Sequence, residues 1–473
     1  MSSPGNKKSG NKPEAESSES DSLYQKHKKV YPRQVHGLFA RLRTTGVLTL
    51  LAIYYGTPWL RWDDRQAVLL DLPNRQFHIF GLTFWPQDFF YFAVLLILAG
   101  ISLFFFTALA GRLWCGYACP QTVWTEAFLW IERKIEGTRS QQMKLDKASM
   151  TGSKFNKKFI KHFVWISFSA FTGFTFVGYF TSVDVLWNNI ISLDMGPWES
   201  FWVIFYSFAT YGNAGWLREQ VCIYMCPYAR FQSAMFDKDT LVISYDDKRG
   251  DPRGSRKKSA DPKELGLGDC VDCTLCVQVC PTGIDIRNGL QYQCIGCAAC
   301  VDVCNEVMDK VGYERGLVRY TTENEIEGKK THLFRPRIIL YATILAGVAV
   351  ALLIAIANRV PLELDIIRDR NALYREISGG LVENIYNLRI INMSAEQQRY
   401  HLQASGLEGL TLINPKGDVD VNPGEVFQLN VQVRLDPVVL KRPSNEIVFT
   451  LESLGPEPLK IQENARFIGP VIR

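Results

Sequence analysis

Long apolar runs without charge alternate with strongly charged segments along this chain of 473 residues. Five of the runs approach the roughly 20 mainly apolar residues that a helix needs to cross a bilayer. A buried helix of a large soluble protein is the alternative, but a stretch such as FFYFAVLLILAGISLFFFTALA favours a membrane span. We predict transmembrane α-helices at about residues 44–60, 89–110, 163–183, 200–217 and 338–357, of which the first and fourth are short.

The segment 359–473 shows instead the period of two that is typical of half-buried strands. Its clearest example is FQLNVQVRL at residues 427–435, which follows the turn sequence Asn422-Pro423-Gly424. Short alternating strands at this spacing predict a β-sandwich of immunoglobulin type, although the Cys-Trp-Cys hallmark of antibody domains is absent. The other alternating stretches are Tyr386-x-Leu388-x-Ile390, Tyr400-x-Leu402 and Ile447-x-Phe449-x-Leu451.

The predicted β-domain contains no cluster of residues typical of catalysis. We therefore interpret it as a docking module rather than an enzyme. His401 lies in one of its predicted strands, and because the nearby sequence offers no partner we expect a structural role for it.

The beginning of the chain has almost no apolar residues. Residues 1–35 are rich in Ser, Lys, Glu and Gly, a composition that cannot bury enough surface to fold, so a disordered tail is predicted. No apolar stretch lies close to Met1, so we expect no cleavable signal peptide and assign membrane targeting to the first span.

The distribution of Lys and Arg between the spans predicts the orientation. Residues 111–161 contain ten of them, the loop 61–88 contains three and the loop 184–199 contains none. Because cytoplasmic loops carry the excess of positive charge, the N-terminus and residues 111–161 are expected in the cytoplasm. An odd number of spans then places residues 359–473 in the periplasm, for a multi-pass protein of the bacterial inner membrane.

Eight of the twelve cysteines form two closely spaced runs between the fourth and fifth spans. The runs read Cys270-x2-Cys273-x2-Cys276-x3-Cys280-Pro281 and Cys294-x2-Cys297-x2-Cys300-x3-Cys304. This is the spacing of bacterial two-cluster ferredoxins, in which the fourth Cys of each run binds the other 4Fe-4S cluster. We therefore predict one cluster on Cys270, Cys273, Cys276 and Cys304, and a second on Cys294, Cys297, Cys300 and Cys280.

Disulfides and zinc knuckles account for these eight cysteines less well than iron–sulfur clusters do. Disulfide frameworks suit small secreted domains, and zinc knuckles rarely form an uninterrupted run of three thiolates. One departure from the ferredoxin pattern is Asn305, which stands where the first run has Pro281 and is expected to alter the packing of one cluster without removing a ligand.

The remaining four cysteines form a repeated motif, Cys-x-Tyr-x-Cys-Pro. Cys115 and Cys119 follow the second span, and Cys222 and Cys226 follow the fourth, at an offset of 107 residues. Both motifs are expected at the cytoplasmic ends of their spans, where they could meet. The proline after each motif should end or kink a helix. Soft thiolates here suit Cu(I), zinc or a further iron–sulfur centre, and a redox-active dithiol or simple packing are the alternatives.

After the first motif, residues 122–137 have apolar side chains at helical spacing with charges on the other side. This pattern predicts an amphipathic helix, which would lie either on the inner membrane surface or against the ferredoxin domain. The sequence does not decide between the two places.

Together these features resemble the FixG/CcoG family, also called RdxA or RdxB, which are cytochrome oxidase accessory proteins of bacteria. The resemblance covers nearly the whole chain from about residue 35 and depends on both motif types, since either alone would fit several membrane-bound ferredoxins. It implies a role in assembling the cbb3-type cytochrome c oxidase, as a cupric reductase that converts Cu(II) to Cu(I). The eight ferredoxin cysteines would then hold the clusters, and the catalytic candidates for copper handling would be Cys115, Cys119, Cys222 and Cys226.

The resemblance also implies partners and a division of the chain. Oxidase assembly factors or copper chaperones are expected, a homodimer is left open, and nucleic acid is not expected. No nucleotide or flavin fingerprint is present, so electrons should come from a separate protein or from quinol. The predicted parts are the tail 1–35, a four-helix membrane region 36–230, a ferredoxin domain 231–335, the fifth span 336–358 and the β-sandwich 359–473.

Two other functions fit the same motifs. The chain could be a conduit that passes quinol electrons to a periplasmic reductase, although the β-domain is not expected in the membrane ferredoxins that do so. It could also be a non-enzymatic assembly scaffold whose clusters only sense redox state. Loss of the ferredoxin cysteines should harm a scaffold less than a reductase.

Overall fold

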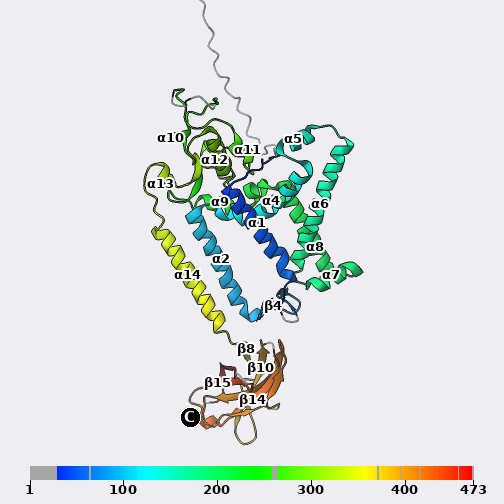
Figure 1. Cartoon of the computed structure of the whole chain (residues 1–473). Helices are drawn as coiled ribbons and strands as arrows, with labels where there is room; N and C mark the ends of the chain where they lie inside the picture. The colour runs from blue at the N-terminus through cyan, green and yellow to red at the C-terminus, as the bar shows by residue number, and fades with distance from the viewer. Residues whose placement is uncertain are drawn as a thin grey trace, which may run out of the picture.

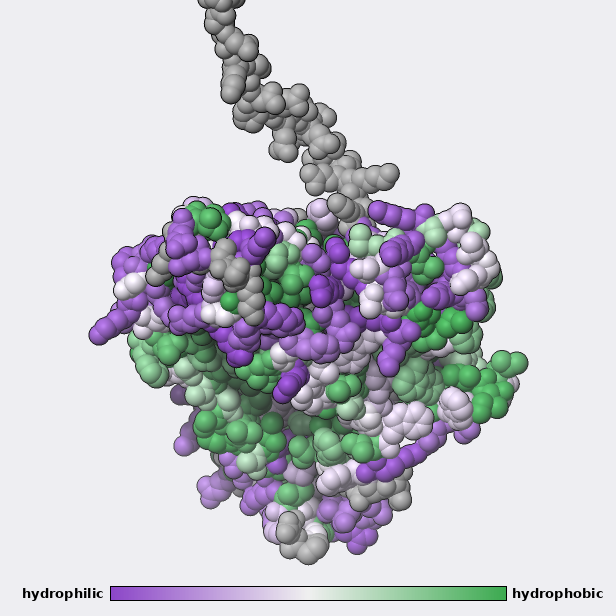
Figure 2. Space-filling view, turned by 45° about the horizontal axis from the view of Figure 1, so that its top comes forward, coloured by the Kyte–Doolittle hydropathy of each residue, from purple (hydrophilic) through white to green (hydrophobic). Residues whose placement is uncertain are grey.

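The computed structural model describes residues 29–470 except 63–64, 258–260, 262–263, 370–371, 395, 415 and 456–457. Most of the predicted disordered tail therefore lies outside the described residues. Figure 1 shows three layers, with the ferredoxin region at one end of a group of long helices and the β-domain at the other end. Figure 2 shows an apolar band directly beneath the polar surface of the ferredoxin end.

Three helices of the described chain are long and apolar enough to cross a membrane. They are α2 (Phe89–Ala110), α6 (Gly152–Val177) and α14 (Pro336–Ala357). They correspond to the second, third and fifth predicted spans, although α6 begins 11 residues before the predicted start, in a charged stretch, and ends at Val177. Helix α14 packs along α2.

The first and fourth predicted spans do not meet the same criterion. Helix α1 (Leu38–Gly56) carries Arg41 and Arg43 in its first two turns, which shortens its apolar part. Helix α8 (Pro197–Thr210) has only 14 residues and then widens into the π-helix η3 (Tyr211–Leu217), whose sequence YGNAGWL contains two glycines. The prediction of five spans is therefore supported for three helices only. Both shorter helices nevertheless lie in the same layer as the three long ones, and α8 packs along α6 (Figure 1).

The segments between the long helices on the β-domain side form small sheets and a short helix. One sheet pairs β1 (Arg61–Trp62) with β2 (Arg65–Gln66), and the other has the order β3-β4-β5. The remaining elements on this side are η1 (Thr57–Trp59), β3 (Val68–Asp71), β4 (Gln76–Ile79), β5 (Leu82–Phe84), η2 (Pro86–Asp88) and α7 (Val183–Ser192).

The C-terminal part is a sandwich of two antiparallel sheets, as predicted. One sheet has the order β12-β14-β10-β8, with β9 also paired to β10, and the other has the order β13-β11-β15-β16. All the alternating stretches found in the sequence lie in its strands, and their apolar residues fill one core. The elements are β8 (Leu362–Arg368), β9 (Arg375–Glu376), β10 (Val382–Asn392), β11 (Gln398–Ser405), β12 (Thr411–Ile413), β13 (Val419–Val421), β14 (Val426–Leu435), η6 (Pro437–Val439), β15 (Ser444–Ser453) and β16 (Lys460–Ile468).

His401 has a partner that the nearby sequence does not show. Its Nδ1 lies 2.6 Å from Oδ1 of Asp418, and both side chains are exposed. Asp418 follows 17 residues later, immediately before β13, the strand that pairs with β11, and the structural role of His401 stays a prediction.

A buried ion pair attaches the β-domain to the membrane region. Arg359, just after α14, donates from Nε to Oδ1 of Asp88 at 2.9 Å, and both side chains are about nine-tenths buried. Trp85 packs beside this pair against Ile391 and Met393 of the β-domain. The sandwich is therefore held at the start of α2, through Asp88, as well as by the chain connection from α14.

Helix α4 (Pro120–Glu136) is the predicted amphipathic helix, and it packs against other helices of the protein, while its place relative to a membrane surface stays a prediction. It contacts α6, η3 and α1, and its charged residues Glu132 and Glu136 are buried. Lys161 of α6 reaches both carboxylates, at 3.3 Å from Glu132 and 2.8 Å from Glu136. Buried carboxylates are stable only when paired in this way.

Helix α5 (Arg139–Lys147) attaches the start of the described chain. Asp146 accepts hydrogen bonds from Lys29 at 3.0 Å, from Tyr31 at 2.7 Å and from Lys158 at 2.5 Å. Although burial acts to raise it, these hydrogen bonds hold the pKa of Asp146 well below its usual range. The segment before α1 is therefore ordered against the basic loop that precedes α6.

The ferredoxin region is built around two short helices and one pair of strands. Strand β6 (Val242–Tyr245) pairs with β7 (Val318–Thr321), and both pack on α12 (Ala299–Val311). The smaller elements around them are α3 (Leu113–Tyr117), η4 (Val221–Met225), α9 (Pro227–Ser233), α10 (Asp247–Gly250), α11 (Leu275–Val279), η5 (Ile286–Asn288) and α13 (Glu323–Ile326).

Helix α12 also provides the N-terminal cap of α1. The Asp302 carboxylate, which is buried, accepts hydrogen bonds from the backbone N–H of Ala40 at 2.7 Å and of Phe39 at 3.3 Å. A carboxylate at a helix N-terminus satisfies free N–H groups and interacts favourably with the helix dipole. The ferredoxin region is thereby fixed to the first long helix.

Replacing Gly37 by Ala should weaken this attachment. A Cβ at residue 37 would lie 2.3 Å from the carboxylate carbon of Asp302, so the carboxylate would have to move away from the helix end. We expect overpacking to cost about 1–3 kcal/mol, seen as roughly tenfold faster amide hydrogen exchange at Phe39 and Ala40. The matched control is Gly100→Ala in α2, where an added Cβ meets nothing within 4 Å. Equal exchange in both variants would contradict the role of the cap.

Candidate functional site

The structure brings each predicted ligand quartet around its own cavity in the ferredoxin region. Leu275, Met308 and Leu317 are among the apolar residues of the first cavity, and Ile243, Ile286 and Ile295 line the second. The cysteines that line the first are Cys270, Cys273, Cys276 and Cys304, and those that line the second are Cys280, Cys294, Cys297 and Cys300, with Cys276 between the two.

The backbone of the two halves repeats the same unusual conformation. Asp272 and Thr274 flank the second Cys of the first run with φ of 50° and 56°, and Gly296 and Ala298 do the same in the second run with φ of 68° and 57°. Left-handed residues other than Gly cost energy and are found where a site requires them. Alternation of left-handed and right-handed residues turns successive N–H groups toward one point, as is typical of iron–sulfur sites. The donor set and the backbone therefore fit two clusters.

The absence of a proline after Cys304 lets the local helix continue, and an effect on the packing of one cluster stays a prediction. Helix α11 ends at Val279, and Cys280 is extended before Pro281. Helix α12 continues past Cys304 to Val311. Asn305 uses this continuation, because its Oδ1 accepts a hydrogen bond from the N–H of Gly316 at 3.0 Å.

The two Cys-x-Tyr-x-Cys-Pro motifs have the same local structure. In each, the first Cys lies in a short helical turn, α3 for Cys115 and η4 for Cys222. In each, the second Cys is extended and precedes a proline at the first position of the next helix, α4 after Cys119 and α9 after Cys226. Proline favours an extended residue before it and is well suited to the first helical position, so it both ends one helix and starts another.

The four cysteines of these motifs, which we call the four-cysteine site, lie near one another. Burial raises the pKa of the Cys115 thiol to about 12, and the neighbouring Cys119, Cys222 and Cys226 raise it further, while Arg112 opposes them. Burial likewise raises the pKa of Cys222 to about 11. Burial also raises the pKa of Cys119, partly offset by the N–H groups of Gln121 and Thr122. A soft cation that replaces the thiol protons would offset the repulsion between neighbouring thiolates.

No three His, Cys, Asp or Glu side chains of the described chain converge closely enough to hold a single metal ion. For the ferredoxin quartets this is expected, because a cubane cluster separates its ligands.

The four-cysteine site lies directly against the second cluster cavity. A Cβ on Gly116 would lie 2.9 Å from the carbonyl oxygen of Gly296 and 3.0 Å from that of Ile295. The two backbones therefore touch, and the Cys115 side chain packs in the same apolar group as Cys297 and Ile295. No side chain lies between the backbone of the first motif at Gly116 and the loop that carries Cys294 and Cys297.

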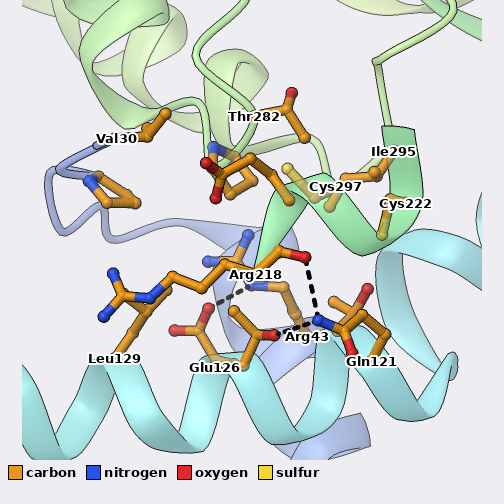
Figure 3. A pocket seen from close by; sticks show the side chains of 15 residues that line it. Val30, Arg43, Gln121, Glu126, Leu129, Arg218, Cys222, Thr282, Ile295 and Cys297 are labelled. Carbon is orange, nitrogen blue, oxygen red and sulfur yellow. Dashed lines mark hydrogen bonds and ion pairs between the residues drawn. The ribbon is translucent and has the colours of Figure 1, made fainter. Parts of the chain in front are cut away.

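The second motif faces the same loop across a small cavity whose lining includes charged side chains, shown in Figure 3. Cys222 and Cys297 both line this cavity, together with Arg43, Glu126 and Arg218. Gln121 crosses it and donates to the carbonyl oxygens of Arg218 at 3.0 Å and of Asn213 at 2.9 Å.

Buried charges hold the wall of this cavity in place. Arg218 donates from Nη2 to Oε2 of Glu132 at 2.9 Å, and both side chains are at least nine-tenths buried. Arg43 lies 3.9 Å from Glu126, which Arg133 also contacts at 2.9 Å. Arg218 is left-handed, with φ of 45°, at the end of η3. The ion pair with Glu132 therefore sets where the chain turns toward Cys222.

Sequence reasoning missed Arg112, Arg218, Glu132 and the two close glycines. The charged residues look like an ordinary basic loop and an amphipathic helix in the sequence. A usable signal was the position of Arg112 and Arg218, since each lies a few residues before the first Cys of its motif.

Replacing Gly116 by Ala should separate the two sulfur sites. Ala is a better helix former than Gly, so α3 itself should not suffer, and any effect must come from the contact with Gly296. We expect roughly tenfold faster maleimide labelling of Cys115 in the detergent-purified protein, because local opening exposes the thiol. Peptide mass spectrometry measures this rate.

The matched control is Gly152→Ala, where an added Cβ meets nothing within 4 Å. The control should label at the native rate. Native labelling of Cys115 in Gly116→Ala would show that the backbone contact does not hold the motif.

Three family models match the chain. Residues 217–323 match a 4Fe-4S dicluster domain, residues 91–137 match a 4Fe-4S binding domain, and residues 352–470 match the Ig-like fold at the C-terminus of FixG. The first match includes the second Cys-x-Tyr-x-Cys-Pro motif and all eight ferredoxin cysteines, and the second includes Cys115 and Cys119.

Several proteins are similar over most of the chain. The identity is 42% to the protein RdxA of Cereibacter sphaeroides, over 83% of this chain and 85% of RdxA, and 41% to RdxB of the same organism, with the same coverage. The nitrogen fixation protein FixG of Rhizobium meliloti is 38% identical over 87% of each chain. The crystal structure of a FixG-related protein from Vibrio parahaemolyticus is 35% identical and covers 23% of this chain and 95% of that one, with a TM-score of 0.21.

Proposed function

The chain belongs to the FixG family, to which RdxA and RdxB are also similar, and from this we propose that it reduces Cu(II) to Cu(I) for assembly of the cbb3-type cytochrome c oxidase. It is an iron–sulfur electron-transfer protein associated with a membrane. The observation that carries the proposal is the contact between the four-cysteine site and the loop of Cys294 and Cys297.

The eight ferredoxin cysteines are the proposed ligands of two 4Fe-4S clusters, in the quartets that line the two cavities. When bound, such clusters supply and accept single electrons. Apolar side chains line both cavities, Cys273 is exposed, and left-handed residues flank Cys273 and Cys297. The contact of Gly116 with Gly296 keeps the path to the four-cysteine site short.

Copper is the substrate in this proposal. One electron converts one Cu(II) to Cu(I), and thiolates of the four-cysteine site hold the soft product. Burial raises the pKa of the Cys115 and Cys222 thiols, so binding of Cu(I) to these two residues would release their protons. A pair of thiolates suffices, because Cu(I) accepts two-coordinate binding. Pairing of Arg218 with Glu132 fixes the approach of the Cys222 motif.

The membrane arrangement follows from the same proposal. We infer five spans, with α1 and α8 extending into their charged or π-helical ends, and with the N-terminus and ferredoxin region in the cytoplasm of the bacterial inner membrane. The β-sandwich would then dock oxidase assembly factors or copper chaperones in the periplasm. A homodimer is compatible with this arrangement.

A second candidate is an electron conduit in which the four-cysteine site holds an iron–sulfur centre. The match of residues 91–137 to a 4Fe-4S binding domain favours it, because that segment contains Cys115 and Cys119 but none of the eight ferredoxin cysteines. The two candidates differ in what the four cysteines bind, so metal content separates them.

Anaerobic reduction of Cu(II) tests the proposal. Purified, dithionite-reduced protein should convert Cu(II) to Cu(I) with stoichiometric bleaching of its cluster absorption, and the Cu(I) should remain bound. A variant with Ser at residues 115, 119, 222 and 226 should keep the iron content of the native protein and lose bound Cu(I) at least tenfold, because hydroxyls are poor ligands for Cu(I).

Two results would contradict the proposal. Equal Cu(I) formation and retention in both proteins would mean that copper is reduced away from the four-cysteine site. Loss of iron from the Ser variant would instead assign an iron–sulfur centre to that site and favour the conduit.

A further inference from the structure

Another cavity, separate from the two cluster cavities and from the one beside Cys222, borders the loop of Cys294 at the end of α2. Its volume is about 240 Å³, and Cys294 and Gly296 form part of its wall. The other lining residues come from the end of α2 and the residues just after it, from β6 and the residues before it, from the region before the second cysteine run and from β7: Ala110, Arg112, Phe236, Leu241, Val242, Ile243, Leu290, Gln291, Tyr292 and Tyr320.

The cavity lies where a membrane helix ends. Ala110 is the last residue of α2, and the N–H of Leu241 donates to the carbonyl oxygen of Leu109 at 3.2 Å. Arg335, which precedes α14, donates to the carbonyl oxygen of Ala108 at 2.5 Å. Helix α2 therefore ends at this cavity, and α14 begins close to the end of α2. A place beside the end of a long apolar helix suits a ligand that is dissolved in the membrane.

The lining selects a small aromatic ligand with few charges. Among the described lining residues only Arg112 is charged, and its Nη2 already donates to the carbonyl oxygen of Ala229 at 2.9 Å. A nucleotide or flavin phosphate would have no further cationic partner there. A cavity of roughly 150 Å³ lined by apolar side chains binds benzene, so this somewhat larger one has room for a substituted ring. Leu290 and Tyr292 stand half exposed at its edge.

One polar side chain of the lining can orient such a ring. The Tyr320 hydroxyl is already used, because it donates to the carbonyl oxygen of Gly296 at 2.5 Å and is also hydrogen-bonded to the Tyr117 side chain. Gln291 donates from Nε2 to the carbonyl oxygen of Asp285 at 2.6 Å. This hydrogen bond uses its amide nitrogen and leaves its amide oxygen as an acceptor for a ligand. A few polar groups in an apolar cavity are typical of small-molecule sites.

From these observations we propose that the cavity between the end of α2 and Cys294 binds the ring of a membrane quinol, the electron donor of this protein. The inference rests on the proposed function for its electron acceptors. Oxidation of one quinol to quinone releases two electrons and two protons. The two proposed 4Fe-4S clusters, when bound at their cysteine quartets, would accept one electron each, and the two protons would go to water at the half-exposed edge.

Photo-crosslinking of an azido-labelled short-chain ubiquinone to the full-length protein in detergent tests the site. Peptide mass spectrometry should find the label within residues 236–243 or 290–292. Leu290→Trp should fill the entrance and reduce labelling at least tenfold. The matched control is Leu265→Trp, since Leu265 is equally exposed, at 55% against 50% for Leu290, and does not line the cavity. The control should label as the native protein does.

The result that would overturn the inference is labelling confined to other segments, or equal labelling of native protein and Leu290→Trp. Exclusive reduction by a soluble donor protein would also overturn it. Dithionite-driven Cu(II) reduction by Leu290→Trp separates this failure from failure of the proposed function. Normal copper reduction with no quinone labelling in the native protein would reject the cavity alone, whereas specific labelling without copper reduction would retain the cavity and reject the reductase.

Discussion

Two glycines allow the backbones of the membrane region and the ferredoxin region to touch. Gly116 belongs to the turn that carries Cys115, and Gly296 belongs to the loop that carries Cys294 and Cys297. A side chain at either position would push the loops apart. Electron transfer weakens steeply with distance, so this contact decides whether two groups of sulfur ligands act as one site or as two independent ones.

Other contacts of the fold hold the Gly116 and Gly296 backbones against each other. Asp302 caps α1 from the ferredoxin side, and the Glu132 and Arg218 pair sets the turn toward Cys222. Ion pairs this deeply buried are costly to desolvate and contribute little to stability in general. Their use here lies in positioning, because the helix that carries Glu132 begins immediately after Cys119. The charges on α4 thus tie the two Cys-x-Tyr-x-Cys-Pro motifs together.

The sequence was most informative where chemistry sets the spacing of residues. The ferredoxin cysteines predicted which residues share a cavity, and the prolines predicted extended residues at Cys119 and Cys226. The period of two predicted the sandwich. Helix α8 was harder, because hydropathy does not reveal that its end widens into a π-helix. Contacts between distant segments, such as Asp302 with Ala40 or Gly116 with Gly296, leave no local pattern and could not be predicted.

The proposed function requires a metal in the four-cysteine site to lie beside the cluster proposed for Cys280, Cys294, Cys297 and Cys300. Its most direct test is electron paramagnetic resonance of the dithionite-reduced protein loaded with Co(II), a paramagnetic ion whose thiolate absorption band reports occupancy. The account predicts that Co(II) speeds the relaxation of one cluster signal much more than the other, and that Cys115→Ser with Cys222→Ser removes the effect. Full occupancy by Co(II) with no change in either cluster signal would contradict it.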